Sequence, residues 1–229
     1  TIAPPSPLTH QRIEMNGILN IDKPHGWTSH DVVAKLRSLL KIRRIGHTGT
    51  LDPAATGVLL ICIGKATRVA EYLVAREKEY RAVLRLGETT DTQDGTGQVI
   101  EQHDVGNITK PQLQAVMRQF TGDIFQMPPM YSAVKINGVP LYKLARAGQT
   151  IPRPTRPVHI SHIGIDAIRG TDVMLNVTCS KGTYVRTLCH DIGAALAIGG
   201  HMRHLTRLRV GSFQRNQSLT INTIEQLHR

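Results

Sequence analysis

The sequence predicts an α+β fold, in which a mixed, largely antiparallel central sheet is flanked by helices. Strand-like segments outnumber those that a regular alternation of strand and helix would need. Several of these segments are also close neighbours in the chain, as in hairpins. The chain has 229 residues, and we expect one domain over 15–229, preceded over 1–14 by a Pro-rich segment that is a flexible extension or a tag.

The first three elements are a short strand, a helix and a buried strand. Residues 17–22 form a short apolar run that is typical of a strand. Residues 28–40 place apolar side chains at helical spacing, and either Thr28 or Ser29 is expected to cap this helix. The run GVLLICIG over 57–64 is apolar and has the length of a core strand.

The next two elements are each expected to turn an apolar face toward the core. Residues 65–75 predict a helix with Val69, Tyr72 and Leu73 directed inward. Residues 78–87 alternate in character along the chain, which predicts a strand with one apolar face.

A polar loop and a well-marked helix follow. Residues 88–98, ETTDTQDGTGQ, predict a loop that ends in a turn. It superficially resembles a calcium-binding loop, but no Gly stands sixth from Asp91 and no Glu twelfth, so we reject that interpretation. Residues 108–122 predict a helix that Thr109 caps and Gly122 ends.

The rest of the chain predicts strands and helices in a less regular order. We expect a strand end, an Asn-Gly turn and a short helix over 135–148, a Pro-stiffened connector over 149–158, paired strands over 158–168 and 172–180, a helix over 183–197, a strand over 204–213 and a closing helix over 220–227. This mixture favours an α+β architecture over a regular parallel sheet.

The charge balance indicates a polyanionic partner. The chain holds 28 Lys and Arg against 17 Asp and Glu, a formal net charge of +11. Lys and Arg that neutralise phosphates release condensed counterions, so this excess favours binding to nucleic acid. A merely basic protein is the plain alternative.

The cysteines and the apolar runs indicate a cytoplasmic protein. Cys62, Cys179 and Cys189 are odd in number and widely spaced, which argues against disulfides and a zinc site and favours a reducing compartment. Each is expected to be a small buried apolar residue. We expect no membrane span, because the longest apolar run has only the length of a core strand, and we expect no signal peptide.

One acidic residue, Asp52, stands among small residues in GHTGTLDPAATG, residues 46–57. The glycines permit a close approach of the backbone to a ligand, and Pro53 favours an extended Asp52 with a projecting carboxylate. An ordinary turn made by the Asp52 side chain is the alternative. A phosphate-binding loop is disfavoured because no Lys-Ser or Lys-Thr follows the glycines, and the order of residues does not fit an aspartyl-phosphate enzyme.

Four long stretches of the sequence are informative when they are taken together. In chain order they are DKPHGWTSHDVV, GHTGTLDPAATGVLLICIGKATR, KEYRAVLRLGETTDTQDGTG and CSKGTYVRTLCHDIG. Together they closely resemble the TruB family of pseudouridine synthases, which isomerise uridine 55 in the T-loop of tRNA. The resemblance runs from about residue 15 to the last strand. The stretch 127–158 also resembles this family and implies a thumb-like insertion at about 123–157.

The resemblance implies three catalytic residues, Asp52, Tyr80 and Arg186. Asp52 matches the catalytic aspartate, which attacks C1′ or the base or acts through a glycal route, and the sequence does not choose among these. Arg186 matches the arginine whose guanidinium orients that aspartate and keeps it ionised. Tyr80 matches a tyrosine that stacks on the target base and can accept a proton. The isomerisation involves no redox change, so no cofactor and no metal are expected.

The resemblance also implies residues that bind the substrate or support the site. His47 matches a histidine that helps to extract the base and fill its place. The implied substrate-binding residues are His47, Tyr184, Leu205 and Lys181, and the implied supporting residues are Lys23 and Pro24. The expected partner is the T-arm of tRNA, and the chain is expected to act as a monomer with no protein partner.

Further basic residues are expected to line the path of the RNA. They are Lys41, Arg43, Arg44, Arg68, Lys135, Lys143, Arg146, Arg153, Arg156, Arg203 and Arg207. Bacterial members of the family usually carry a C-terminal RNA-binding domain of the PUA type. We expect no such domain here, because only a short segment follows the last predicted strand; either the chain has been shortened or it belongs to a branch without this domain. A non-catalytic RNA-binding or chaperone protein that uses the same groove is the alternative function.

Overall fold

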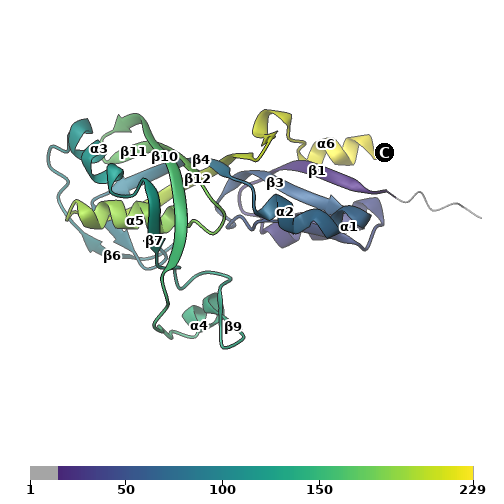
Figure 1. The fold of residues 1–229 in the computed structure, drawn as a ribbon, viewed down its shortest axis with the longest axis horizontal. Coiled ribbons are helices and arrows are strands. Elements are labelled where there is room, and N and C mark those ends of the chain that lie inside the picture. Colours follow the sequence, from purple (N-terminus) through teal and green to yellow (C-terminus); the bar gives the residue numbers. More distant parts are fainter. Residues whose placement is uncertain (1–14, 229) are drawn as a thin grey trace, which may run out of the picture.

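The central feature of the fold is a nine-stranded sheet (Figure 1). Residues 15–228 are described here from a computed structural model, so the predicted extension over 1–14 lies outside the described residues. The strands follow one another across the sheet in the order β1 (Gly17–Lys23), β3 (Thr56–Ile63), β12 (Gly200–Val210), β4 (Lys78–Leu86), β11 (Asp172–Cys179), β10 (Arg156–Arg169) and β7 (Gly122–Gln126), with β2 (Ile45–Thr48) on β3 and β13 (Phe213–Gln214) on β12. Among these pairs, β3 and β12 run parallel and the others antiparallel, so the predicted mixed, largely antiparallel sheet is confirmed.

Helices cover the two halves of this sheet separately (Figure 1). The first group packs beside β2 and comprises α1 (Ser29–Leu40) and α2 (Ala70–Val74). The second group packs beside β4, β10 and β12 and comprises α3 (Lys110–Arg118) and α5 (Val185–Ala195). The closing helix α6 (Ile221–Leu227) contacts β1. Strands β3, β12 and β4 therefore form the junction between the two halves.

Side-chain caps fix the starts of three helices. Thr28 caps α1 in a reciprocal arrangement with Asp31, so the sequence's choice between Thr28 and Ser29 is settled in favour of Thr28. Thr109 caps α3 in the same way, as predicted, and Thr220 caps α6. Ser29 is left free to face the core, where it is 1% exposed.

A helical segment is present over most of 65–75, but the prediction of which of its side chains face the core is wrong. The segment begins as a 3₁₀-helix over Gly64–Val69 and becomes α-helical only over Ala70–Val74. Val69 is 42% exposed and Tyr72 is 64% exposed, and of the three predicted side chains only Leu73 packs against buried residues. A 3₁₀ turn holds three residues, so a spacing of 3.6 counted from residue 65 predicts the wrong direction for Val69 and for the start of the α-helical turn that follows.

A large hydrophobic core and a smaller separate cluster around Val58, Leu60 and Val210 are buried in the described part of the chain. The larger one draws on both halves of the chain, and Cys179 and Cys189 belong to it. All three cysteines are buried and free, as expected for small apolar residues. None of the helices in the described part of the chain has the length and apolarity that crossing a membrane would require.

Short strand pairs and a projecting segment complete the architecture. The polar loop predicted over 88–98 contains strand β5 (Glu88–Thr90), which pairs with β6 (Val99–Gln102). Between β7 and β10 the chain leaves the sheet and forms β8 (Lys135–Ile136), β9 (Val139–Pro140) and α4 (Leu141–Arg146). In Figure 1 this segment projects away from the sheet, and it covers most of the insertion expected over 123–157.

Candidate active site

The loop that holds Asp52 connects β2 to β3 at the junction of the two halves of the sheet. At its end Gly57 has a φ of +100°, and a Cβ built there would lie 2.2 Å from the carbonyl oxygen of Arg207. Only glycine fits this close approach of two backbones. The backbone carbonyl of Asp52 accepts a hydrogen bond from Ala55 N at 3.0 Å, so the turn closes through the backbone and the carboxylate remains available.

Two buried polar side chains hold this loop from the side of α1. Ser29 Oγ accepts from Leu51 N at 2.9 Å and donates to Leu51 O at 3.2 Å. Lys23 is fully buried, and its Nζ donates to Pro24 O at 2.9 Å and to Pro53 O at 3.3 Å. Burial lowers the pKa of Lys23 to about 8, while the nearby Asp52 carboxylate acts in the opposite direction. Asp52 is thus flanked on both sides by anchored residues.

The structure brings Asp52 and Arg186 into contact. Arg186 Nη2 lies 3.1 Å from Asp52 Oδ2, although the two residues belong to opposite halves of the sheet. The Arg186 side chain is 6% exposed, whereas that of Asp52 is 38% exposed. The same Nη2 donates to Tyr131 O at 2.8 Å, which fixes the direction of the guanidinium. A charge-assisted contact of this kind gives the carboxylate one orientation.

A second carboxylate, Asp94, which was not among the predicted site residues, faces the other side of the same guanidinium. Arg186 Nη1 lies 3.8 Å from Asp94 Oδ2, and Asp94 is 8% exposed. The hydroxyls of Thr92 and Thr96 donate to Asp94 Oδ1 at 2.8 Å and 2.5 Å. The only signal in the sequence was an acidic residue in a polar loop, which most often marks a solvated turn.

Burial raises the pKa of Asp52 above its ordinary value of 3.8. The Arg186 guanidinium opposes this shift, the Asp94 carboxylate adds to it, and Lys23 opposes it. Arg186 and Lys23 therefore favour the ionised form of Asp52, while burial and the Asp94 carboxylate favour the protonated form. The carboxylate is held more weakly as an anion than an exposed aspartate would be.

We expect the Asp94→Asn substitution to lower the pKa of Asp52, because it removes a like charge that raises this pKa. If turnover needs ionised Asp52, the acid limb of a plot of single-turnover rate against pH shifts to lower pH in this variant. Asp104→Asn is the matched control, since Asp104 accepts a bond from Gly106 N and is not among the groups that shift Asp52. An unmoved acid limb in Asp94→Asn would contradict this electrostatic account.

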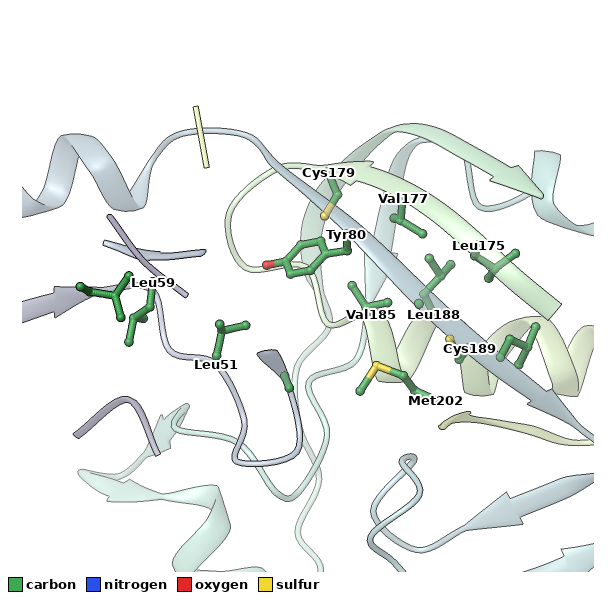
Figure 2. Packing of buried hydrophobic residues seen from close by; sticks show 14 of the residues in the cluster. Leu51, Leu59, Tyr80, Leu175, Val177, Cys179, Val185, Leu188, Cys189 and Met202 are labelled. Carbon is green, nitrogen blue, oxygen red and sulfur yellow. The ribbon is translucent and has the colours of Figure 1, made fainter. Parts of the chain in front are cut away.

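Tyr80 lies on β4 beside the loop and is 7% exposed. In Figure 2 its ring lies among Cys179, Val177 and Val185, and its hydroxyl points away from Val177 toward the side of Leu51. Burial raises the pKa of Tyr80, and the neighbouring Arg207 guanidinium opposes that shift. The phenol is therefore neutral in the neutral pH range.

His47 lies on β2 and forms a ring pair with His30. The ring centroids are 5.3 Å apart and the rings are inclined by 75°. His47 Nδ1 is buried with no hydrogen-bond partner. Burial, followed by the charges of His30 and Arg207, lowers the pKa of His47, so the neutral ring is favoured. The side chain of His47 is therefore an uncharged aromatic ring on the strand that leads into the Asp52 loop.

The remaining predicted residues lie around this centre. Tyr184 precedes α5, its backbone is anchored by reciprocal bonds with Gln126 at 2.7 Å and 3.0 Å, and its ring centroid lies 6.0 Å from Arg186 Cζ. Leu205 on β12 is partly buried against the core. Lys181 is exposed, and Pro24 is partly buried next to Lys23.

The prediction that Arg207 lines an exposed RNA path is wrong. Arg207 is 1% exposed, and its bonds run to backbone carbonyl groups of the protein. Its guanidinium is directed into the fold, where Nε donates to Val58 O at 2.7 Å and Nη2 donates to Gly49 O at 3.0 Å. Of the other basic residues, Arg153 is partly buried, and Arg203 is exposed with Nη1 2.5 Å from Asp172 Oδ2. The remaining members of the predicted set are exposed: Lys41, Arg43, Arg44, Arg68, Lys135, Lys143, Arg146 and Arg156.

Two cavities in the described part of the chain lie apart from these residues. One has a volume of about 900 Å³ and is lined from β5, β6 and the loop before α3. The other has a volume of about 590 Å³ and is lined from β12, β13 and neighbouring residues. None of the predicted site residues lines either cavity. The cluster of charged side chains formed by Asp52, Arg186 and Asp94 remains the candidate active site.

The chain matches two known protein-family domains. Residues 37–185 match the TruB family pseudouridylate synthase N-terminal domain, and residues 186–229 match the tRNA pseudouridylate synthase B C-terminal domain. The fold is that of the pseudouridylate synthases. Within that class, the chain belongs to the TruB family.

Named relatives and solved structures agree with this assignment. The chain is 48% identical over 217 residues to a tRNA pseudouridine synthase B of Stutzerimonas stutzeri (strain A1501), covering 95% of this chain and 71% of the relative. It is 49% identical to the protein of that name from Syntrophotalea carbinolica, covering 92% of this chain and 69% of the relative. A crystal structure of a Cbf5-Nop10-Gar1 complex matches with a TM-score of 0.73 and 34% identity, covering 93% of this chain and 54% of that chain.

Proposed function

We propose that this chain is an RNA pseudouridine synthase that isomerises uridine 55 in the T-loop of tRNA. The observation that carries the proposal is the contact of 3.1 Å between Arg186 and Asp52, an oriented carboxylate in a loop of small residues. The relatives named tRNA pseudouridine synthase B support the choice of tRNA as substrate. A tRNA substrate implies a cytoplasmic reaction, and we include action as a monomer in the proposal.

The proposed chemistry breaks the bond between N1 of uracil and C1′ of the ribose and forms a bond between C5 and C1′. The proton of C5 leaves, and N1 gains one, so the product is an isomer of the substrate. Asp52 is the group that attacks C1′ or the base, or that takes the 2′ proton of a glycal route. Arg186 holds its carboxylate as an anion against the effect of burial.

The target nucleotide must leave its stack before this chemistry, which costs a few kcal/mol. A neutral His47 ring fits the space that the base vacates, since a charged ring would lose more solvation in that stack. The partly buried Leu205 and the ring of Tyr184 form walls that keep water from the detached ribosyl centre. The exposed basic residues bind the backbone of the folded RNA.

The proposal is tested by tritium release from an unmodified tRNA transcript that contains 5-tritiated uridine. We expect the release of one equivalent of tritium per tRNA, and no such release from a transcript with cytidine at position 55. A chain that binds the transcript but releases no tritium would instead support the alternative of a non-catalytic RNA-binding or chaperone protein.

The Tyr80→Phe substitution separates two roles of this tyrosine. The ring that stacks on the base is kept, so the Kd for the transcript is expected to stay within a fewfold of the wild type. The hydroxyl is lost, so a single-turnover rate that depends on it is expected to fall by about 10²-fold or more. The two constants are measured by filter binding and by rapid quench. A rate equal to that of the wild type would limit Tyr80 to stacking.

A further inference from the structure

The backbone of Arg207 pairs with both of the strands that carry parts of the candidate site. In the sheet it is the register partner of Gly57 on β3 and of Tyr80 on β4. Gly57 ends the loop that carries Asp52, and Tyr80 is the buried aromatic residue beside it. Strand β12 therefore places Arg207 between both groups, and its side chain is 1% exposed.

The guanidinium of Arg207 closes the base of the Asp52 loop. Its Nε donates to Val58 O at 2.7 Å, and its Nη2 donates to Gly49 O at 3.0 Å. Gly49 precedes Asp52 and Val58 follows it, so one planar group ties the incoming and outgoing ends of the loop together. A planar fork with several fixed donors can do this, whereas the single ammonium of a lysine cannot reproduce both directions.

The same guanidinium lies close to Tyr80, and its positive charge opposes the effect of burial on the pKa of that phenol. Backbone carbonyl oxygens, rather than carboxylates, are the hydrogen-bond partners that the described residues give to Arg207. Burying a cation without a carboxylate is costly, so a purely structural explanation would have to offset that cost with packing and these two hydrogen bonds.

We propose that Arg207 is a positioning residue, which holds the Asp52 loop in one arrangement beside Tyr80, and that it does not contact RNA. This inference rests on the proposed function, because the arrangement matters only if Asp52 and Tyr80 act on the same nucleotide. A loop closed at its base keeps the carboxylate near its attack geometry, and a displacement of about 1 Å can lower a rate by about 10²-fold.

The test compares Arg207→Lys with Arg209→Lys in the tritium-release assay. Arg209 lies on the same strand and is also bonded through its guanidinium, to Glu77, Glu79 and Gly211 O, but not to the Asp52 loop. We expect Arg207→Lys to lower the single-turnover rate by about 10²-fold, with the Kd for the transcript within about threefold of wild type. Arg209→Lys is expected to keep the wild-type rate and Kd, even if its Tm falls as far as that of Arg207→Lys.

Hydrogen exchange supplies a second measurement on the same two proteins. In Arg207→Lys, amides of residues 46–57 are expected to lose protection selectively, while the core strands keep theirs. A uniform loss of protection, with a normal rate per folded molecule, would identify Arg207 as merely structural and overturn the proposal. A weaker Kd with a smaller salt dependence and an unchanged rate would identify it as a phosphate contact, with the same consequence.

Three further outcomes are distinguishable. If Arg207→Lys does not fold, Arg207→Gln is tested in its place, since Gln retains one neutral donor, and failure of both to fold would overturn the positioning role. If the wild type binds the transcript and releases no tritium, the proposed function itself fails, and the inference fails with it. A wild type that turns over normally beside an equally active Arg207→Lys contradicts only the inference.

Discussion

The Asp52→Asn substitution is expected to abolish tritium release, with a loss on the order of 10⁴-fold or more in the single-turnover rate. Asparagine has almost the same shape as aspartate, but its amide is neither a nucleophile nor a base. The ion pair between Asp52 Oδ2 and Arg186 Nη2 at 3.1 Å is replaced by a hydrogen bond from the charged guanidinium to a neutral amide oxygen, which can still accept. Binding of the transcript is expected to be retained, since Asp52 faces the RNA as a like charge.

The stability of the Asp52→Asn variant carries a separate prediction about pH. Burial raises the pKa of Asp52 in the folded state above 3.8, so the folded chain binds this proton more tightly than the unfolded chain. The stability that wild type owes to the proton is fully present below the unfolded pKa and is lost as the pH rises through the folded pKa. Asn titrates nowhere, so the variant is expected to gain stability relative to wild type across that window, as measured by urea unfolding at several pH values.

The two measurements together decide the role of Asp52. Loss of turnover with a folded, equally stable or more stable protein assigns the loss to chemistry. Tritium release by Asp52→Asn at the wild-type rate would move the catalytic role to another residue. A variant that loses turnover because it unfolds would instead show reduced binding of the transcript in proportion to its unfolded fraction.

The sequence predicted the sheet and the contact of Asp52 with Arg186, but for different reasons. Strands such as β4 and β11 show alternation or apolar runs, so their existence follows from local pattern. The contact joins residues 134 positions apart, and no local pattern specifies such a pair; the resemblance to a known family supplied it. The structure adds the distance and the burial that a motif cannot give.

What the sequence missed depends on tertiary context. In the sequence, Asp94 resembles an ordinary loop residue. Only in the folded chain does its carboxylate face Arg186 and accept hydrogen bonds from the hydroxyls of Thr92 and Thr96. From the sequence, Arg207 looks like one more surface cation, because a strand pattern does not reveal that its guanidinium is buried against backbone carbonyl groups. Buried charges are rare enough that the surface was the better guess for each residue taken alone.

The Arg186→Lys substitution is expected to lower the single-turnover rate by about 10²-fold while the protein still folds. Lysine keeps a positive charge between Asp52 and Asp94, so neither carboxylate is left without a cation. It lacks the planar fork, however, and one ammonium cannot reach Asp52, Asp94 and the Tyr131 carbonyl in the directions that the guanidinium does. The carboxylate of Asp52 then has more than one orientation, and a smaller fraction of the bound complex is reactive.

The control for Arg186→Lys is Arg85→Lys on β4. Arg85 makes a two-pronged pair with Asp172, through Nε at 2.5 Å and Nη2 at 3.1 Å, so the same change from fork to point charge is made outside the site. Both variants are expected to lose some stability, but only Arg186→Lys is expected to lose turnover per folded molecule. Equal rates in the two variants would mean that the orientation of Asp52 by Arg186 is not needed, because a point charge in the same place would then serve as well.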